Sequence, residues 1–259
     1  MKIYSKNQRA TKHAEAVLAE IKRCKDDPVY FINQYGFCGK GQALKLWPHQ
    51  EAFIRELHTN KTVIALKPRQ SGLTLVTEWY IIWKIVFEQN QSIVSLLNST
   101  SQYGHCTNNV AWKLANLPQE LKPTLHYQDA SKISFSNGVT VRFMDYKSAS
   151  SNGLRGLSID FLHMSELAMQ EKQIQEDLWM TVVQCLAKPG KSAVIESSPN
   201  GRDNLFAEMW HNALAGNHTF TPFRVYVEDL PHYSDTWKAH ALAICSQKGY
   251  SQDYDCEFI

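Results

Sequence analysis

A short apolar run passes into a polar, glycine-containing loop at Thr62-Val63-Ile64-Ala65-Leu66-Lys67-Pro68-Arg69-Gln70-Ser71-Gly72-Leu73-Thr74. The β-branched apolar run is typical of a buried strand. Residues 75–86, which follow the loop, are long and apolar enough for a buried helix. A strand, a tight loop and a helix N-terminus collect phosphate, because backbone N–H groups and the helix dipole point at one spot. We therefore predict a phosphate-binding loop at residues 67–74.

This loop departs from the usual P-loop pattern, Gly-x-x-x-x-Gly-Lys-Ser/Thr. Lys67 stands where the first glycine belongs, and Leu73 stands where the phosphate-binding lysine belongs. Gly72 and the hydroxyl of Thr74 remain in place. Lys67 ends a buried strand, where an ammonium group is costly unless something anionic meets it. We therefore expect Lys67 to supply the positive charge that the phosphate needs.

Composition narrows the class of protein. The 259 residues include 27 basic and 25 acidic side chains, so the net charge is +2. Such a small net charge indicates neither a nucleic-acid nor a membrane partner. The six cysteines are widely spaced and form no Cys-x-x-Cys pair, which suggests neither a zinc site nor a disulfide framework. The N-terminus lacks the apolar core of a signal peptide, and no window approaches roughly 18 uncharged apolar residues. We expect a cytoplasmic protein with reduced thiols.

Strand and helix patterns alternate along most of the chain. Further buried strands are predicted at 92–97, 159–164 and 192–196, and further helices at 11–24, 28–32, 48–58, 99–117, 174–185 and 202–215. Asn137-Gly138, between 132–135 and 139–143, is typical of a β-hairpin. The alternation predicts an α/β fold with a mainly parallel central sheet flanked by helices, to which the hairpin is an antiparallel addition.

Polar segments follow three of the predicted strands. They are the loop at 67–74, Ser165-Glu166 and the segment 197–201. Ligands of parallel α/β sheets bind at the carboxyl ends of the strands, so we expect these segments to meet. An apolar strand followed by an acidic residue is typical of a Walker B site, where one carboxylate helps to hold Mg²⁺ and the next positions the attacking water. Here Ser165 occupies the metal-side position and Glu166 is the candidate base, unless Glu166 only stabilises a helix N-terminus.

Taken in order, these motifs resemble the large terminase subunit of tailed bacteriophages, the motor ATPase that pumps DNA into procapsids. The resemblance covers most of the chain and implies a P-loop NTPase of the ASCE or RecA-like type. Five segments carry it: 46–50, similar to the adenine motif; 67–74, similar to a deviant Walker A with its lysine at the start; 152–156, similar to the Arg-Gly turn; 161–168, similar to a Ser-Glu form of Walker B; and 197–201, similar to the coupling motif.

The resemblance implies a role for each of these residues. The nucleotide-binding set is Gln50, which would read the adenine edge, with Lys67, Arg69, Gln70, Ser71, Gly72, Leu73 and Thr74. The metal side is Thr74 and Ser165, the catalytic set is Glu166, Arg69 and Arg155, and the coupling set is Ser197, Ser198 and Asn200. Two alternatives stay open. Arg69 contacts the γ-phosphate or pairs with a carboxylate inside the domain, and Arg155 is a turn residue or an arginine finger for the neighbouring subunit.

The expected organisation follows from the same resemblance. A helical N-terminal region at 1–45 packs on an ATPase core at 46–216, and a C-terminal lid or linker at 217–259 leads toward a nuclease domain that is absent from this chain. Family members carry a nuclease domain of RNase H type, but no acidic cluster for two-metal DNA cleavage is recognisable in the sequence, so we expect no nuclease activity.

Substrate, cofactor and partners are also implied by the resemblance. ATP is the expected substrate and Mg²⁺ the expected cofactor. Double-stranded DNA, the portal protein and the small terminase subunit are the expected partners. We expect a monomer in isolation and a homo-oligomeric ring, pentameric by resemblance, on the procapsid. The location would be the cytoplasm of the infected bacterial host and, transiently, the procapsid portal.

Two other functions remain open. Leu73 and Ser165, in place of the usual lysine and aspartate, would suit a nucleotide-binding assembly module with weak or decayed ATPase activity, although Thr74 and Glu166 argue against decay. A helicase-like ATPase shares a glutamine motif, a P-loop and a Ser-rich coupling motif. It needs a second RecA-like lobe, for which 259 residues leave no room.

Overall fold

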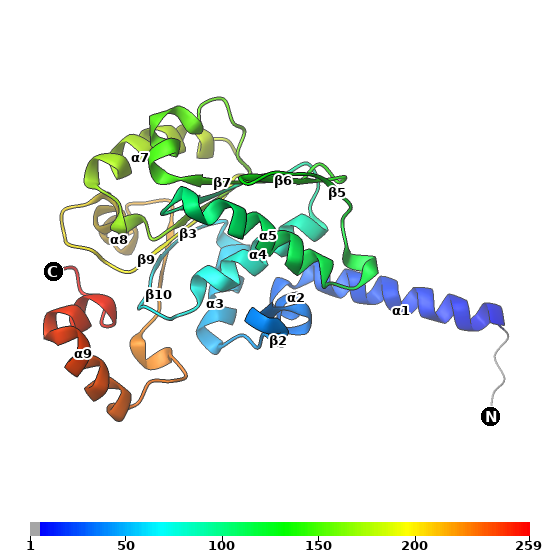
Figure 1. The fold of residues 1–259 in the computed structure, drawn as a ribbon, viewed down its shortest axis with the longest axis horizontal. Coiled ribbons are helices and arrows are strands. Elements are labelled where there is room, and N and C mark those ends of the chain that lie inside the picture. Colours follow the sequence, from blue (N-terminus) through cyan, green and yellow to red (C-terminus); the bar gives the residue numbers. More distant parts are fainter. Residues whose placement is uncertain (1–5) are drawn as a thin grey trace.

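An eight-stranded sheet forms the middle layer of the fold (Figure 1). The computed structural model describes residues 6–259, without the side chains of residues 6–10, Lys40, Thr100 and Asn152. The strand order is β10-β3-β9-β8-β4-β7-β6-β5. All neighbours from β10 to β7 are parallel, whereas β6 is antiparallel to both β7 and β5. The predicted α/β class with a mainly parallel sheet is therefore confirmed.

The strands of this sheet are β3 (Thr62–Leu66), β4 (Ser92–Leu97), β5 (Leu125–Gln128), β6 (Lys132–Phe135), β7 (Thr140–Asp145), β8 (Phe161–Ser165), β9 (Ser192–Ser197) and β10 (Thr221–Arg224). The predicted hairpin is β6–β7, which turns at Asn137-Gly138 with Gly138 at a φ of 81°. Strand β10 was not predicted. It lies within 217–259, where we expected a lid or linker, and forms the edge of the sheet beside β3.

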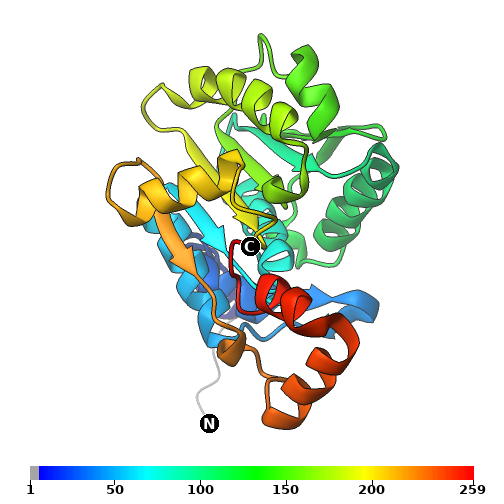
Figure 2. The same cartoon turned by 90° about the vertical axis from the view of Figure 1, so that its left-hand side faces the viewer.

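Helices cover both faces of the sheet (Figures 1 and 2). One layer contains α3 (Pro48–Asn60), α4 (Leu73–Phe87) and α5 (Tyr103–Ala115), and the other contains α7 (Lys172–Leu186) and α8 (Leu205–Leu214). The side chains of β3 alternate between them, because successive residues of a strand point to opposite faces. Val63 and Ala65 belong to the core under α3–α5, and Ile64 and Leu66 to the core under α7 and α8.

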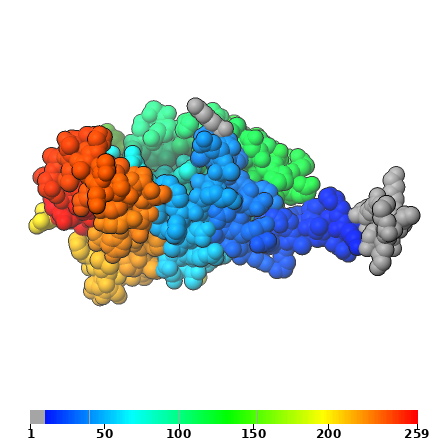
Figure 3. Space-filling view, turned by 90° about the horizontal axis from the view of Figure 1, so that it is seen from below, coloured from blue at the N-terminus to red at the C-terminus, as the bar shows by residue number. Residues whose placement is uncertain are grey.

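The N-terminal region consists of α1 (Lys6–Asp26), α2 (Pro28–Tyr35) and a small antiparallel pair, β1 (Phe37–Cys38) and β2 (Gln42–Ala43). Asp27 caps α2 by accepting from the N–H groups of Val29 and Tyr30. The end of α1 and α2 pack on the core through Cys24 and Phe31. The N-terminal part of α1 projects away from the body (Figures 1 and 3), and Leu18, in the second half of the helix, is 66% exposed.

The remaining α-helices among the described residues are α6 (Tyr146–Ser148), a short turn after β7, and α9 (Asp235–Asp253) near the C-terminus. The predicted helix at 202–215 is shorter, because α8 starts at Leu205, where the Asn204 side chain caps it by accepting from the N–H of Ala207. Between residues 6 and 259 no helix combines the length and apolar character needed to cross a bilayer.

Candidate nucleotide site

The carboxyl ends of β3, β9 and β8 lie side by side, because these three parallel strands are consecutive neighbours in the sheet. The Lys67 N–H donates to the Ser197 carbonyl oxygen over 3.1 Å, and the Glu166 N–H donates to that of Glu196 over 2.7 Å. The polar segments that follow the three strands thus meet at one edge of the sheet, as the parallel arrangement predicted.

The loop after β3 is held in place by Gln50, which is buried near the start of α3. Its Nε2 donates to the Ser71 carbonyl oxygen over 3.0 Å, and its Oε1 accepts from the Trp47 N–H over 3.1 Å. Gly72 has a φ of 74°, and a Cβ there would lie 2.4 Å from Gln50 Nε2, so a side chain is excluded twice. Gln50 therefore positions the loop, and its contact with adenine stays a prediction.

The N-terminus of α4 faces this loop and carries no side-chain capping bond. The first backbone N–H groups of a helix lack intrahelical partners, so they are available to an anion. Leu73 is fully buried in the core, which limits its part in such a site to its backbone. Gln70 is exposed and has a φ of 63°.

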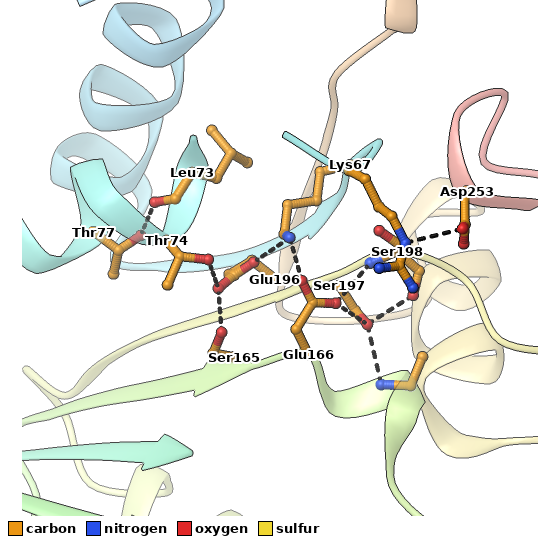
Figure 4. Close-up of polar contacts among 12 residues, drawn as sticks. Lys67, Leu73, Thr74, Thr77, Ser165, Glu166, Glu196, Ser197, Ser198 and Asp253 are labelled. Atoms are coloured by element: carbon orange, nitrogen blue, oxygen red, sulfur yellow. Dashed lines mark hydrogen bonds and ion pairs between the residues drawn. The ribbon is translucent and has the colours of Figure 1, made fainter. Parts of the chain in front are cut away.

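Lys67 points between two carboxylates (Figure 4). Its side chain is only 6% exposed, contacts Glu166 Oε1, and has its Nζ 3.1 Å from Glu196 Oε2. Burial alone would lower the pKa of Lys67, but the charges of Glu196 and Glu166 more than offset burial and raise the pKa above its ordinary value. A charged ammonium group is therefore held at the start of the loop, and its contact with phosphate stays a prediction.

Glu196 is the centre of the polar cluster, and it was not predicted from the sequence. Its Oε1 accepts from Thr74 Oγ1 over 2.8 Å and from Ser165 Oγ over 2.6 Å, and it lies 3.4 Å from His163 Nε2. The side chain is fully buried. Burial raises the pKa of its carboxyl group, but Lys67, His163 and Ser165 outweigh burial and hold the pKa below its ordinary value. A carboxylate ending an otherwise apolar buried strand was the signal that could have found it.

Glu166 follows β8 in the left-handed region, with φ 56° and ψ 45°. Non-glycine residues rarely adopt this conformation, and functional sites are where such strain concentrates. Its Oε2 accepts from the Ser198 N–H over 3.3 Å and lies 3.4 Å from Ser197 Oγ. The amide of Asn200 donates to the Ala168 carbonyl oxygen, two residues after Glu166. The predicted coupling residues thus contact the predicted base and the segment that follows it.

Two buried hydroxyl groups at this edge have no hydrogen-bond partner within the described residues. They are Ser71 Oγ, in the loop after β3, and Ser198 Oγ, in the segment after β9. Leaving a buried hydroxyl unsatisfied costs about 1–3 kcal/mol, so such groups are rare without a reason. The oxygens of an anionic ligand could accept hydrogen bonds from both hydroxyl groups. The edge therefore fits a phosphate-bearing ligand.

The two arginines of the predicted catalytic set lie outside this cluster. Arg69 is 58% exposed and pairs with Asp253, with Nε 2.9 Å from Oδ2. We left open whether Arg69 contacts the γ-phosphate or pairs with a carboxylate, and in this structure it pairs with a carboxylate. Arg155 is exposed and lines a cleft of about 680 Å³ with α7 and Lys191, at the amino ends of β8 and β9. The structure therefore does not bring Arg155 to the Lys67 edge of its own chain.

A mainly parallel sheet with a phosphate-type loop and a paired lysine–glutamate cluster at its strand ends defines an α/β ATPase fold of the P-loop class. Residues 64–259 match the family of the terminase large subunit, T4likevirus-type, N-terminal. The chain therefore belongs to the large terminase family.

Several solved structures with a similar fold are phage large terminases. The ATPase domain from Thermus phage P74-26 is 19% identical, with a TM-score of 0.69 over 89% of this chain and 98% of that one. The enzyme from bacteriophage HK97 is 16% identical, with a TM-score of 0.64 over 91% of this chain and 49% of its own length. A large terminase from a thermophilic bacteriophage, solved in complex with ADP, is 13% identical, with a TM-score of 0.64 over 83% and 54%. This chain thus matches about half the length of the last two proteins.

Proposed function

We propose that this chain is the ATP-hydrolysing motor domain of a phage terminase large subunit, and that it translocates double-stranded DNA into the procapsid. Membership of the large terminase family supports a role in DNA packaging. The observation that carries the ATPase assignment is the buried Lys67 between Glu166 and Glu196, beneath the loop that leads into α4. The thermophilic phage enzyme that was solved with ADP shares this fold.

Phosphate binding in this proposal uses groups that the structure already gathers. Lys67 supplies the positive charge, the first N–H groups of α4 bind phosphate oxygens, and the unpaired Ser71 hydroxyl is a further donor. Thr74 and Ser165 lie on the metal side of the cluster, where the bound Mg²⁺ would neutralise charge on the β- and γ-phosphates. Because Lys67 contacts Glu166 in this structure, an arriving phosphate would draw Lys67 away and free that carboxylate.

Glu166 is then placed to orient the attacking water and accept its proton. The Ser198 N–H that donates to Glu166 Oε2 gives the coupling segment a direct contact with the residue that reports on the γ-phosphate. A shift of Glu166 on hydrolysis would therefore move the segment at 197–200. This contact supports the coupling role that we propose for Ser197, Ser198 and Asn200.

The wider setting is proposed on family membership alone. The partners would be double-stranded DNA, the portal protein and the small terminase subunit, with the chain acting in a ring on the procapsid in the infected bacterial cytoplasm. We also expect no metal-dependent DNA cleavage by this polypeptide. Linearisation of a supercoiled plasmid by the pure protein, lost on chelation, would contradict that expectation.

The test is ATP turnover by the wild-type protein and by Glu166→Gln, with and without double-stranded DNA. Loss of a general base lowers kcat by about 10²–10⁴-fold, while nucleotide affinity should be retained. Glu171→Gln is the matched control, because this exposed carboxylate starts α7 without a capping bond. Wild-type protein that binds ATP but turns it over no faster than Glu166→Gln would instead favour a nucleotide-binding assembly module.

A further inference from the structure

The position after β8 lacks the charge that a metal-side residue normally supplies. P-loop NTPases hold Mg²⁺ with the loop Ser/Thr and an acidic residue at a strand end. Ser165 cannot supply that charge. The neighbouring strand can, because Ser165 and Glu196 are paired in register, and paired residues of adjacent strands project from the same face of the sheet. The 2.6 Å contact from Ser165 Oγ to Glu196 Oε1 shows that the longer side chain lies beside the serine.

The same carboxylate reaches the loop hydroxyl. Thr74 Oγ1 donates to Glu196 Oε1 over 2.8 Å (Figure 4). Within the described chain, Glu196 is thus the acidic residue in contact with the hydroxyl that normally holds Mg²⁺ in this class of site. Ser165 and Thr74 come from different elements, and the Glu196 carboxylate joins them.

Charge balance gives an independent reason. Lys67 already contacts Glu166, so a second carboxylate leaves one more negative than positive charge among the three side chains, and His163, 3.4 Å from Glu196, offsets it only when its ring is protonated. Glu196 is fully buried, and its Oε2 faces Lys67 without a hydrogen bond of good geometry. Burying an excess charge is costly. One carboxylate would suffice to pair Lys67, so the second one needs another explanation. A divalent cation beside Glu196 would balance the cluster once Lys67 turns to phosphate.

The donor set also fits magnesium rather than a self-contained metal cage. No group of three or more His, Cys, Asp or Glu side chains in residues 6–259 is arranged to hold a metal ion by itself. Mg²⁺ is usually bound by one or two carboxylates together with substrate phosphates and water. One carboxylate and one hydroxyl at the phosphate loop match that demand.

We propose that Glu196 is the metal-side carboxylate of this ATPase: with Thr74 it holds the Mg²⁺ of the bound nucleotide, in place of an acidic residue at position 165. The inference rests on the proposed function. It divides the two tasks of a Walker B pair between two strands, with Glu196 on β9 at the metal and Glu166 after β8 at the water.

The test measures metal binding rather than turnover. Mn²⁺ is titrated into the protein with ADP and followed by electron paramagnetic resonance, and binding of a fluorescent ADP analogue is compared in Mg²⁺ and in EDTA. In Glu196→Gln the affinity for Mn²⁺–ADP should fall by about 10–100-fold, the range for lost groups that support a metal site. Binding in EDTA should be retained. Asp160→Asn, a lysine-paired carboxylate at the other end of β8, should keep wild-type metal affinity.

A relocated carboxylate sharpens the test. The double variant Ser165→Asp/Glu196→Gln puts the acid on β8, and it should regain the metal affinity that Glu196→Gln loses. Wild-type protein with Fe²⁺, ADP, ascorbate and hydrogen peroxide adds a measurement that needs no folded variant, because the iron reduces peroxide to radicals that cut nearby backbone and ascorbate re-reduces the iron. We expect cuts near Thr74 and Glu196.

The outcomes separate this inference from the proposed function. Unchanged Mn²⁺ affinity in Glu196→Gln, or cuts near Thr74 without cuts near Glu196, would overturn the role of Glu196 while leaving the ATPase assignment intact. Should the single variant fail to fold, the double variant and the cleavage pattern decide. Absence of any nucleotide binding by the wild-type protein would overturn the proposed function and this inference together.

Discussion

Strands β8 and β9 have lysine–carboxylate contacts at both of their ends, and the two differ in charge balance. At the amino ends, Lys191 Nζ lies 2.6 Å from Asp160 Oδ1, and the other oxygen of Asp160 accepts from the Ser92 N–H over 2.7 Å. One ammonium group meets one carboxylate, with 13% and 23% of the two side chains exposed. Both oxygens of Asp160 therefore have partners, and the charges of the two side chains balance.

At the carboxyl ends, one lysine meets two carboxylates. Lys67 lies between Glu166 and Glu196 in a mostly buried cluster, and the buried Ser71 and Ser198 hydroxyls of the segments after β3 and β9 have no hydrogen-bond partner among the described residues. Both ends of these strands contain an ion pair, but at the carboxyl ends two carboxylates share one lysine, and among the described residues the buried unpaired serine hydroxyls lie there. Charge balance and hydrogen-bond satisfaction, rather than the presence of an ion pair, therefore distinguish a ligand-binding edge from a structural one.

The largest expected effect is on ATP turnover, and it comes from Arg155 at the amino ends of β8 and β9, acting on the site of a neighbouring subunit. Arg155 lies at that edge, so it could serve as a catalytic cation only in trans. An arginine finger is worth about 10³–10⁵ in rate, so Arg155→Ala should lose nearly all turnover in the assembled protein. Mixing Arg155→Ala with Glu166→Gln subunits, each inactive alone, should restore ATP turnover. Full activity of Arg155→Ala at any protein concentration would reduce Arg155 to a turn residue.

The next largest effect is on the free energy of unfolding, which Lys67→Met should lower more than Lys191→Met. Lys67→Met leaves two carboxylates without their cation at a buried site, and breaking a buried ion pair costs about 3–5 kcal/mol. Lys191→Met leaves a single, partly exposed carboxylate that keeps its bond from Ser92, so its cost should stay within about 2 kcal/mol. Urea unfolding at neutral pH measures both. Equal losses would remove the distinction between the edges.

Lowering the pH should reduce the stability that the carboxylates at both ends of the strands contribute. The pKa of Glu196 is held below its unfolded value of 4.5, and that of Asp160 below 3.8. A carboxylate with a lowered pKa stabilises the native state above its unfolded value, and that contribution is lost as pH falls through the folded value. Glu196→Gln should therefore lose less stability than the wild-type protein when urea unfolding is compared at neutral pH and below pH 4.5. A curve parallel to the wild-type one would contradict the lowered pKa of Glu196.

The smallest effect concerns Arg69, which lies at the ligand edge but is held by Asp253. Because the pair is largely exposed on the arginine side, Asp253→Asn should change the unfolding free energy by no more than about 1 kcal/mol. If Arg69 turns to the γ-phosphate during turnover, freeing it should strengthen ATP binding slightly, and Arg69→Ala should reverse that gain. Identical ATP affinity in all three proteins would leave Arg69 as a partner of Asp253 only.

The central sheet was predictable because its strands are buried on both faces. Apolar runs such as 62–66 and 92–97 are therefore continuous, and the Asn137-Gly138 turn has its own local signal. Strand β10 gave no such signal. It is an edge strand of four residues, none of them fully buried, so it lacks an apolar run. Its place depends on pairing with β3, which residues 221–224 alone do not reveal.

The candidate site was predictable where chemistry is local to a strand end. Lys67 and Glu166 each follow an apolar run and lie in the cluster. Glu196 was missed because its importance comes from pairing across strands: it lies opposite Ser165 in register, and sequence alone does not order β9 beside β8. The partner of Arg69 was likewise hidden, since Asp253 is distant in sequence and reaches the loop only through α9.

Nucleotide affinity of the two lysine variants tests the difference between the edges most directly. Binding of ATP-γ-S to wild-type protein, Lys67→Met and Lys191→Met is measured by titration calorimetry, under conditions where unfolding curves show each protein folded. We expect Lys67→Met to bind at least about 100-fold more weakly, a loss of about 2.7 kcal/mol, and Lys191→Met to bind as the wild-type protein does. Wild-type affinity in Lys67→Met, or an equal loss in Lys191→Met, would contradict the assignment of the nucleotide site to the carboxyl ends of β3, β8 and β9.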